Sequence, residues 1–217
     1  SKIFKTVRRN SDDLAALLYT SGTTGRSKGA MLTQNNLLSN AKTLTDLWEV
    51  SENDILIHAL PIFHTHGLFV ALNTALLSGC QVNFLFKFDI DEVIRAMHSS
   101  TLLMGVPTFY TRLLADRRLT ANRTKKMRLF ISGSAPLLAE THEEFTRRTG
   151  HHILERYGMT ETSMITSNPF NGERRPGTVG TALADVEITI IDPETHQKKA
   201  TGEIGGIEVR GPNECKA

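Results

Sequence analysis

Short apolar runs alternate with helical patterns along most of this chain, and this alternation limits the fold more than any other feature. The runs at 54–60, 101–106 and 128–132 have the length and composition of buried strands. Between the first two, apolar residues recur at helical spacing over 90–97, after a capping-box pattern that begins at Asp89. Parallel strands need such crossover helices. The sequence therefore predicts an α/β fold with layered, largely parallel sheets and flanking helices.

Other segments extend the same pattern. The run Leu14–Tyr19 ends at a glycine-rich loop and predicts a buried strand, and residues 66–77, apolar on all sides, predict a buried helix. A helix from Leu137 should end at Gly150. The remaining predicted elements are a helix through Leu37, Ala41, Leu44 and Trp48, a strand at 81–86, a helix that opens at Pro107, and a short strand at 151–154 followed by a tight turn at Gly158.

The pattern changes after residue 165. A turn-rich stretch leads to strict alternation at 186–191, and a polar turn separates this run from an apolar run at 204–209. Such an order predicts an antiparallel hairpin. The end of the chain soon after a predicted strand leads us to expect a piece of a longer protein. The expected division is a linker or truncation scar at 1–11, an α/β core at 12–165 and a β-rich, truncated region at 166–217.

Composition narrows the function classes. Of the 217 residues 40% are apolar and 22% are charged, which is typical of a soluble globular protein. The net charge of +2 gives no general attraction for nucleic acid or membranes, and the basic segment 117–128 has no aromatic residue for base stacking. No apolar run approaches the roughly 20 residues of a membrane span. Two cysteines give no disulfide framework and favour the cytoplasm. The sequence carries no signal for oligomeric state.

The stretch YTSGTTGRSKGAM, residues 19–31, is dense in glycine, serine and threonine. Glycines allow a backbone to turn tightly and approach a ligand, and backbone amides with hydroxyl groups can cradle an anion. Lys28 adds positive charge. The spacing does not fit the phosphate loop of kinases and GTPases, because Ser27 stands where that pattern, counted from Gly22, needs its second glycine. The composition nevertheless favours phosphate binding over a plain turn.

The stretch ERYGMTET, residues 155–162, is a second candidate for the same site. Tyr157 offers a flat face for a base or ring. Glu161 is a hard oxygen ligand of the kind that Mg²⁺ takes beside phosphates. Alone this stretch indicates no more than a surface turn, so its functional interpretation depends on the glycine-rich loop.

Two further segments are weaker candidates. SGSAPL, residues 132–137, lies where a predicted strand meets a helix, and open α/β sheets bind ligands at the carboxyl ends of their strands. An ordinary strand–helix connection is the alternative. LPIFHTHGL, residues 60–68, carries His64 and His66 beside an apolar helix. Their spacing is poor for a metal ion, and structural histidines are the alternative there.

These four segments, in this order, resemble the adenylate-forming superfamily of acyl-CoA synthetases, peptide-synthetase adenylation domains and luciferases. The glycine-rich loop is similar to the signature phosphate loop of that superfamily, and the resemblance covers roughly Asp12 to Asn213. It implies that the loop holds the β- and γ-phosphates of ATP while a carboxylate attacks the α-phosphate. The product would be an acyl-adenylate, from which coenzyme A displaces AMP to form a thioester.

The resemblance also implies roles for individual residues. It assigns His64, Thr160 and Glu161 to catalysis, with Glu161 as the Mg²⁺ ligand. His64, Thr65, Arg156 and Met164 would line the acyl site. The implied ATP- and AMP-binding residues are Thr20, Ser21, Gly22, Thr23, Thr24, Gly25, Lys28, Ser134, Ala135, Pro136, Glu155, Tyr157, Gly158, Met159 and Thr160.

Arg156 departs from the pattern of many relatives, in which a small glycine lines the acyl pocket at this position. A guanidinium here would block a long apolar tail and would be costly if buried without a partner. A second carboxylate on the substrate would pair with it through charge-assisted hydrogen bonds. In this respect the chain resembles the malonyl-CoA synthetases, with malonate or methylmalonate as substrate. The alternative is that Arg156 pairs with Glu155 or another acidic residue of the fold.

Two parts of the superfamily pattern are not found in the 217 residues. They are the Thr-Gly-Asp motif whose aspartate binds ribose, and the small mobile C-terminal domain that carries the catalytic lysine. We therefore expect a central fragment of the large domain, inactive alone. A ligase for a short monocarboxylate, an adenylation domain that loads a carrier thiol, and a nucleotide-binding module without chemistry stay open as alternatives.

Overall fold

A seven-stranded sheet forms the centre of the molecule in the computed structural model, which describes residues 5–20 and 28–215. The strand order is β4-β3-β5-β6-β7-β8-β9. The pairs from β4 to β7 are parallel, and β8 and β9 add antiparallel pairs at the other edge. Its strands are β3 (Ile55–His58), β4 (Gln81–Phe84), β5 (Leu102–Gly105), β6 (Leu129–Ser132), β7 (Leu154–Met159), β8 (Ser163–Ser167) and β9 (Thr181–Ala182).

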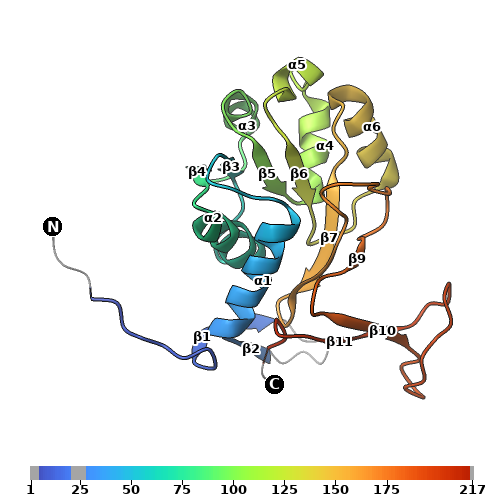
Figure 1. Cartoon of the computed structure of the whole chain (residues 1–217). Coiled ribbons are helices and arrows are strands. Elements are labelled where there is room, and N and C mark those ends of the chain that lie inside the picture. The colour runs from blue at the N-terminus through green and yellow to red at the C-terminus, as the bar shows by residue number, and fades with distance from the viewer. Residues whose placement is uncertain (1–4, 21–27, 216–217) are drawn as a thin grey trace.

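Helices connect the parallel strands as predicted and cover the sheet (Figure 1). The side chain of Asp89 accepts hydrogen bonds from the backbone N–H groups of Asp91 and Glu92, so the expected helix start is confirmed. Gly150 ends the last helix in a left-handed conformation, also as expected. The helices are α1 (Gln34–Leu47), the π-helix η1 (His66–Leu72), α2 (Asn73–Ser78), α3 (Ile90–Ala96), α4 (Pro107–Ala115), α5 (Ala121–Thr124) and α6 (Ala139–Thr149).

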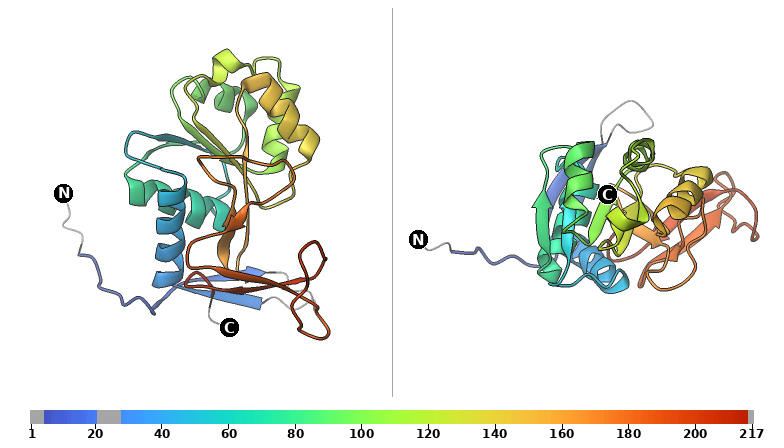
Figure 2. Two further views of the ribbon diagram at one scale, coloured as in Figure 1. Left: turned by 45° about the vertical axis from the view of Figure 1, so that its right-hand side comes forward. Right: turned by 90° about the horizontal axis from the view of Figure 1, so that it is seen from above.

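Two hairpins lie outside the main sheet. Strands β1 (Leu14–Thr20) and β2 (Lys28–Thr33) form one, and β10 (Glu187–Ile191) and β11 (Gly206–Arg210) form the other, which confirms the predicted antiparallel pair. Both hairpins lie at the end of the molecule opposite α3 to α6 (Figures 1 and 2). No helix of the described residues is both long and apolar enough to span a membrane.

The prediction that Leu14–Tyr19 is a buried strand is wrong in its burial. The segment is a strand, but it pairs only with β2 among the described residues and remains largely exposed, with Tyr19 at 71%. The apolar run was sufficient to predict strand conformation, whereas burial depends on what covers the strand. The predicted buried helix at 66–77 is similarly exposed on one side, at Leu76 and Leu77.

The predicted tight turn at Gly158 is also wrong. β7 continues through Gly158, and the turn lies at residues 160–162. Gly158 is opposite Met164 in the β7–β8 pair, where a Cβ atom would overlap the carbonyl oxygen of Ser163. Glycine is therefore required by a close approach of two strands. The expected domain boundary at 165 falls inside β8, and the main sheet continues to β9, which ends at Ala182. The division into domains itself remains a prediction.

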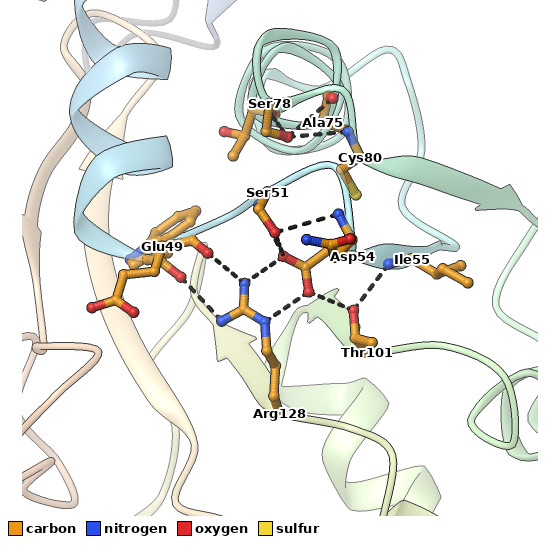
Figure 3. Close-up of polar contacts among 12 residues, drawn as sticks. Glu49, Ser51, Asp54, Ile55, Ala75, Ser78, Cys80, Thr101 and Arg128 are labelled. Atoms are coloured by element: carbon orange, nitrogen blue, oxygen red, sulfur yellow. Dashed lines mark hydrogen bonds and ion pairs between the residues drawn. The ribbon is translucent and has the colours of Figure 1, made fainter.

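A polar network ties together the amino ends of three parallel strands (Figure 3). Asp54 precedes β3, Thr101 precedes β5 and Arg128 precedes β6. Arg128 donates through Nε and Nη2 to the two carboxylate oxygens of Asp54, at 2.7 and 2.6 Å, and Thr101 donates to the same carboxylate at 2.7 Å. Arg128 also donates to the carbonyl oxygens of Trp48 and Glu49. The network stabilises the end of the sheet opposite the carboxyl ends.

Candidate active site

A cavity of about 420 Å³ lies at the carboxyl ends of the parallel strands. Such ends are where open α/β sheets bind ligands, because the loops that follow the strands diverge there. Strand β3 leads to the 60–67 segment, β5 leads to Val106, and β7 contributes Arg156. We call this space the acyl cavity, after the group that the resemblance would place in it. It is lined by Leu60, Pro61, His64, Thr65, His66, Gly67, Val106, Ser134, Arg156, Gly158, Met159, Thr160 and Met164.

A second cavity, of about 260 Å³, lies beside the first, and we call it the base cavity. Its lining includes Ala135, Pro136 and Tyr157, three residues that the resemblance placed at adenine. Ser134, Arg156 and Gly158 line both cavities, so the two share a wall. This arrangement brings the 132–137 and 155–162 segments together, as predicted. The geometry can hold a planar ring on one side of the wall and a small acyl group on the other.

Arg156 is buried in the shared wall, with 3% of its surface exposed. Its Nε and Nη2 atoms have no hydrogen-bond partner among residues 5–20 and 28–215, and no acidic side chain in those ranges forms a salt bridge with it. Burial lowers the pKa of Arg156 to about 10, which leaves the guanidinium charged at neutral pH. A buried charge without a partner is costly, so this guanidinium is a candidate for binding an anion.

Glu155 does not pair with its neighbour Arg156. Its Oε1 atom lies 3.2 Å from Nδ1 of His142 on α6 and accepts a hydrogen bond from the backbone N–H of Gly177, also at 3.2 Å. The first alternative for Arg156 is therefore excluded by the structure. Glu155 and Gly177 both line the base cavity, so their hydrogen bond fixes part of its wall; the predicted direct role of Glu155 in ATP binding remains a prediction.

His66 is a residue of the acyl cavity that the sequence analysis did not assign to the site. It is 5% exposed, and its Nδ1 atom shares a hydrogen bond of 3.2 Å with Oγ of Ser134. Its Nε2 atom is buried without a partner among the described residues. Burial lowers the pKa of His66 well below its usual value, and the charges of Arg156 and His58 lower it further, so the ring is neutral at pH 7.

The two residues before His66, which are His64 and Thr65, differ in exposure. His64 lines the acyl cavity from an exposed position, whereas Thr65 is buried and its hydroxyl has no partner in the described part of the chain. His64 and His66 both line the acyl cavity, although only His66 is buried. The predicted buried helix at 66–77 begins at His66, and this signal for burial next to the 60–65 segment could have assigned His66 to the site.

Among the described residues, a hydrogen bond joins the 155–162 segment to β1, the strand that ends at the predicted phosphate loop. Thr20, the last residue of β1, donates through Oγ1 to Oε1 of Glu161 at 3.1 Å. These residues are 141 positions apart in the chain. Lys28 opens β2 opposite Thr20, so the ends of the loop and the predicted Mg²⁺ ligand lie together. The predicted phosphate ligands Ser21, Gly22, Thr23, Thr24 and Gly25 lie outside the described residues.

Two asparagines missed by the sequence analysis support the far wall of the acyl cavity. Asn40 on α1 donates to the carbonyl oxygen of Met164 at 2.7 Å and accepts from its N–H at 3.2 Å. Asn213 donates to the same carbonyl oxygen and to that of Thr162. Met164 itself is buried and lines the cavity; its predicted contact with the acyl substrate remains a prediction. Both asparagines bind backbone groups far away in the chain, and no local pattern around either residue indicates this role.

Ser134 holds a strained position on the shared wall. Its φ of 69° lies in the left-handed region that side chains rarely adopt. The hydrogen bond to His66 and the short connection between β6 and α6 keep it there. Strain of this kind is typical of ligand sites. No group of three or more His, Cys, Asp or Glu side chains within the described ranges could hold a metal ion by itself.

The comparison with known proteins identifies the family. A family model described as AMP-binding enzyme matches residues 2–216. The chain belongs to the AMP-binding enzyme family. The predicted resemblance to adenylate-forming enzymes and the predicted α/β fold are therefore confirmed.

Individual members of the AMP-binding enzyme family are similar over most of the chain. A malonate–CoA ligase of Arabidopsis thaliana is 40% identical over 222 residues, covering 93% of this chain and 36% of the relative. The structure of ATP-bound MatB from Rhodopseudomonas palustris is 60% identical with a TM-score of 0.96, covering 100% of this chain and 43% of that one. A malonyl-CoA ligase with methylmalonyl-CoA and AMP bound is 40% identical, with a TM-score of 0.86, and 95% of this chain and 45% of that one are covered. This chain thus spans less than half the length of these relatives.

Proposed function

We propose that the full-length protein containing this chain is an ATP-dependent acid–thiol ligase for a small dicarboxylate, malonate or methylmalonate. The substrate carboxylate attacks the α-phosphorus of ATP, pyrophosphate leaves, and coenzyme A then displaces AMP to form the thioester. The observation that carries this proposal is Arg156, a buried guanidinium without an acidic partner among the described residues, in a small cavity beside the base cavity. The similarity to malonate–CoA ligases supports the same substrates.

The two cavities are proposed to bind chemically different groups of the substrates. Tyr157 and the Ser134–Pro136 segment are proposed to hold adenine in the base cavity. The reacting carboxylate would lie near Thr160, where the 155–162 segment meets Thr20 at the end of β1, and the distal carboxylate would lie against Arg156. A charge-assisted pair would compensate for the hydration that the guanidinium loses on burial. His64 and Thr65 supply further hydrogen-bonding groups along the acyl cavity.

The residues present fit a magnesium ion bound together with ATP. Mg²⁺ is typically held by one or two carboxylates and by substrate phosphates, and keeps several waters. Glu161 supplies one carboxylate beside Thr20, at the end of the phosphate-loop strand. We propose Glu161 as the ligand; the ion, when bound, neutralises phosphate charge. The two free cysteines, Cys80 and Cys215, support the cytoplasm as the proposed compartment.

The proposal is tested by measuring pyrophosphate release from the full-length protein with malonate, methylmalonate, acetate and octanoate. We expect release with the two diacids and with coenzyme A present, and weak release with acetate or octanoate. Preference for acetate would indicate a monocarboxylate ligase, and turnover only with a carrier protein would indicate a loading adenylation domain. Binding of ATP–Mg²⁺ without turnover of any acid would leave a nucleotide-binding module and overturn the proposal.

Replacing the proposed magnesium ligand should slow adenylation strongly. In Glu161→Gln the amide still accepts the hydrogen bond from Thr20, but the negative charge is lost. We expect kcat to fall about 100-fold, the scale of losing one important electrostatic group at a transition state, and the requirement for Mg²⁺ to rise. Pyrophosphate release measured across a magnesium titration checks this. Glu203→Gln, at an exposed glutamate in the turn region before β11, is the matched control. Unchanged magnesium dependence in Glu161→Gln would contradict the assignment.

A further inference from the structure

Gly133 lies against the guanidinium of Arg156. It follows β6 directly, and β6 is the parallel neighbour of β7, which carries Arg156. A Cβ atom placed at Gly133 would lie 2.5 Å from Nη1 and 2.6 Å from Nε of Arg156, and closer still to Cζ. Carbon and nitrogen atoms in van der Waals contact need well over 3 Å. The absence of a side chain at residue 133 is therefore what makes room for the head group.

The backbone at Gly133 is held more firmly than the arginine side chain. The N–H of Gly133 donates to the carbonyl oxygen of Gly105 at 3.3 Å, which attaches it to the end of β5. On its other side Ser134 is fixed by its left-handed conformation and by its hydrogen bond to His66. By contrast, Nε and Nη2 of Arg156 make no hydrogen bond to any described residue. If a methyl group were added at residue 133, the guanidinium would move before the backbone did.

We propose that Gly133 is a positioning residue for substrate selectivity: it seats the guanidinium of Arg156 so that it faces the distal carboxylate of the substrate. This inference rests on the proposed dicarboxylate function. It assigns part of the selectivity to a residue that has no side chain and that need not touch the acid. A bidentate pair requires the fork of the guanidinium to be in the correct plane, so a displaced head group would lose the pair although its charge remains.

The test is a double-mutant cycle in the full-length protein. Gly133→Ala, Arg156→Gly and the double variant are compared for kcat/KM with malonate and with acetate. We expect Gly133→Ala to lower malonate kcat/KM at least about tenfold in the wild-type background and less than about twofold in the Arg156→Gly background, where no guanidinium remains to be displaced. Acetate kcat/KM should change less than malonate kcat/KM. Gly206→Ala is the matched control, because a Cβ there meets Ile191 only at ordinary contact distance.

A crystal structure of Gly133→Ala without substrate gives a second readout that does not depend on activity. We expect the guanidinium to be displaced while β6 and β7 keep their register. An unmoved guanidinium would overturn the inference, and so would an equal loss of malonate activity in both backgrounds, since the effect would then arise from the backbone or the base cavity. If the wild-type protein does not use malonate, the proposed function fails, and the displacement still tests the seating of Arg156.

Discussion

Arg156→Gly should abolish the preference for malonate and methylmalonate. Removing the guanidinium leaves the distal carboxylate of the substrate in a half-apolar cavity without a partner, which is costly. We expect malonate kcat/KM to fall about 100-fold or more, the equivalent of about 2.7 kcal/mol of transition-state stabilisation. The glycine also enlarges the acyl cavity, so octanoate should become a better substrate. Steady-state pyrophosphate release with both acids measures the two effects.

Arg156→Met separates charge from volume. Methionine removes the charge but fills much of the same space, so malonate should be lost as in Arg156→Gly while octanoate gains little. The KM for ATP should stay close to that of the wild type in both variants, provided that the base cavity keeps its shape. Malonate use that survives in both variants would show that Arg156 has a structural role only. The dicarboxylate assignment would then be withdrawn.

The parallel part of the fold was predictable because its signals are local. An apolar run of strand length and a capped amphipathic helix each determine their own conformation, and the crossover rule then makes neighbouring strands parallel. The exposure of β1 was not predictable in this way. Whether Leu17 and Tyr19 are buried depends on segments that pack against the strand, and no pattern within Leu14–Thr20 contains that information.

The same distinction between local and tertiary signals applies to the residues of the candidate site. The residue types in the 132–137 and 155–162 segments suggested ligand binding, and their meeting at the shared wall follows from strand order. The role of Asn213 did not follow, because a buried amide that holds the backbone of residues 162 and 164 leaves no trace near its own position in the chain. The role of His66 did not follow either, because its hydrogen bond to Ser134, 68 positions away, depends on the tertiary structure.

Breaking the polar network at the amino ends of β3, β5 and β6 should lower the free energy of unfolding substantially. Arg128→Met leaves the carboxylate of Asp54, which is only 4% exposed, without its bidentate partner. It also removes the donors to the carbonyl oxygens of Trp48 and Glu49. Removing one partner of a largely buried pair costs about 3 kcal/mol. Urea denaturation and hydrogen exchange of peptides covering 51–58 and 101–105 measure the loss.

Arg118→Met is the matched control for Arg128→Met. Arg118 also makes a close pair with an aspartate, Asp116, but its side chain is 48% exposed. Exposed pairs are screened by water and salt and contribute little. Arg118→Met should therefore leave the urea midpoint nearly unchanged. Equal losses in the two variants would show that the Asp54 network has no special role.

The pH dependence of stability gives an independent test of this network. Burial raises the pKa of Asp54, but hydrogen bonds from Arg128, from the backbone of Ser51 and from Thr101 outweigh it, and the net pKa is lowered. A carboxyl whose pKa is lower in the folded state stabilises the protein above its unfolded value of about 3.9, and that contribution is lost as the pH falls through the folded value. In Arg128→Met the principal cause of the lowering is gone. The stability difference between wild type and Arg128→Met should therefore be full at pH 6 and shrink below about pH 4, because the protonated Asp54 no longer needs its partner. A difference that stays constant from pH 6 to pH 3 would mean that Arg128 stabilises the sheet through its bonds to Trp48 and Glu49 instead.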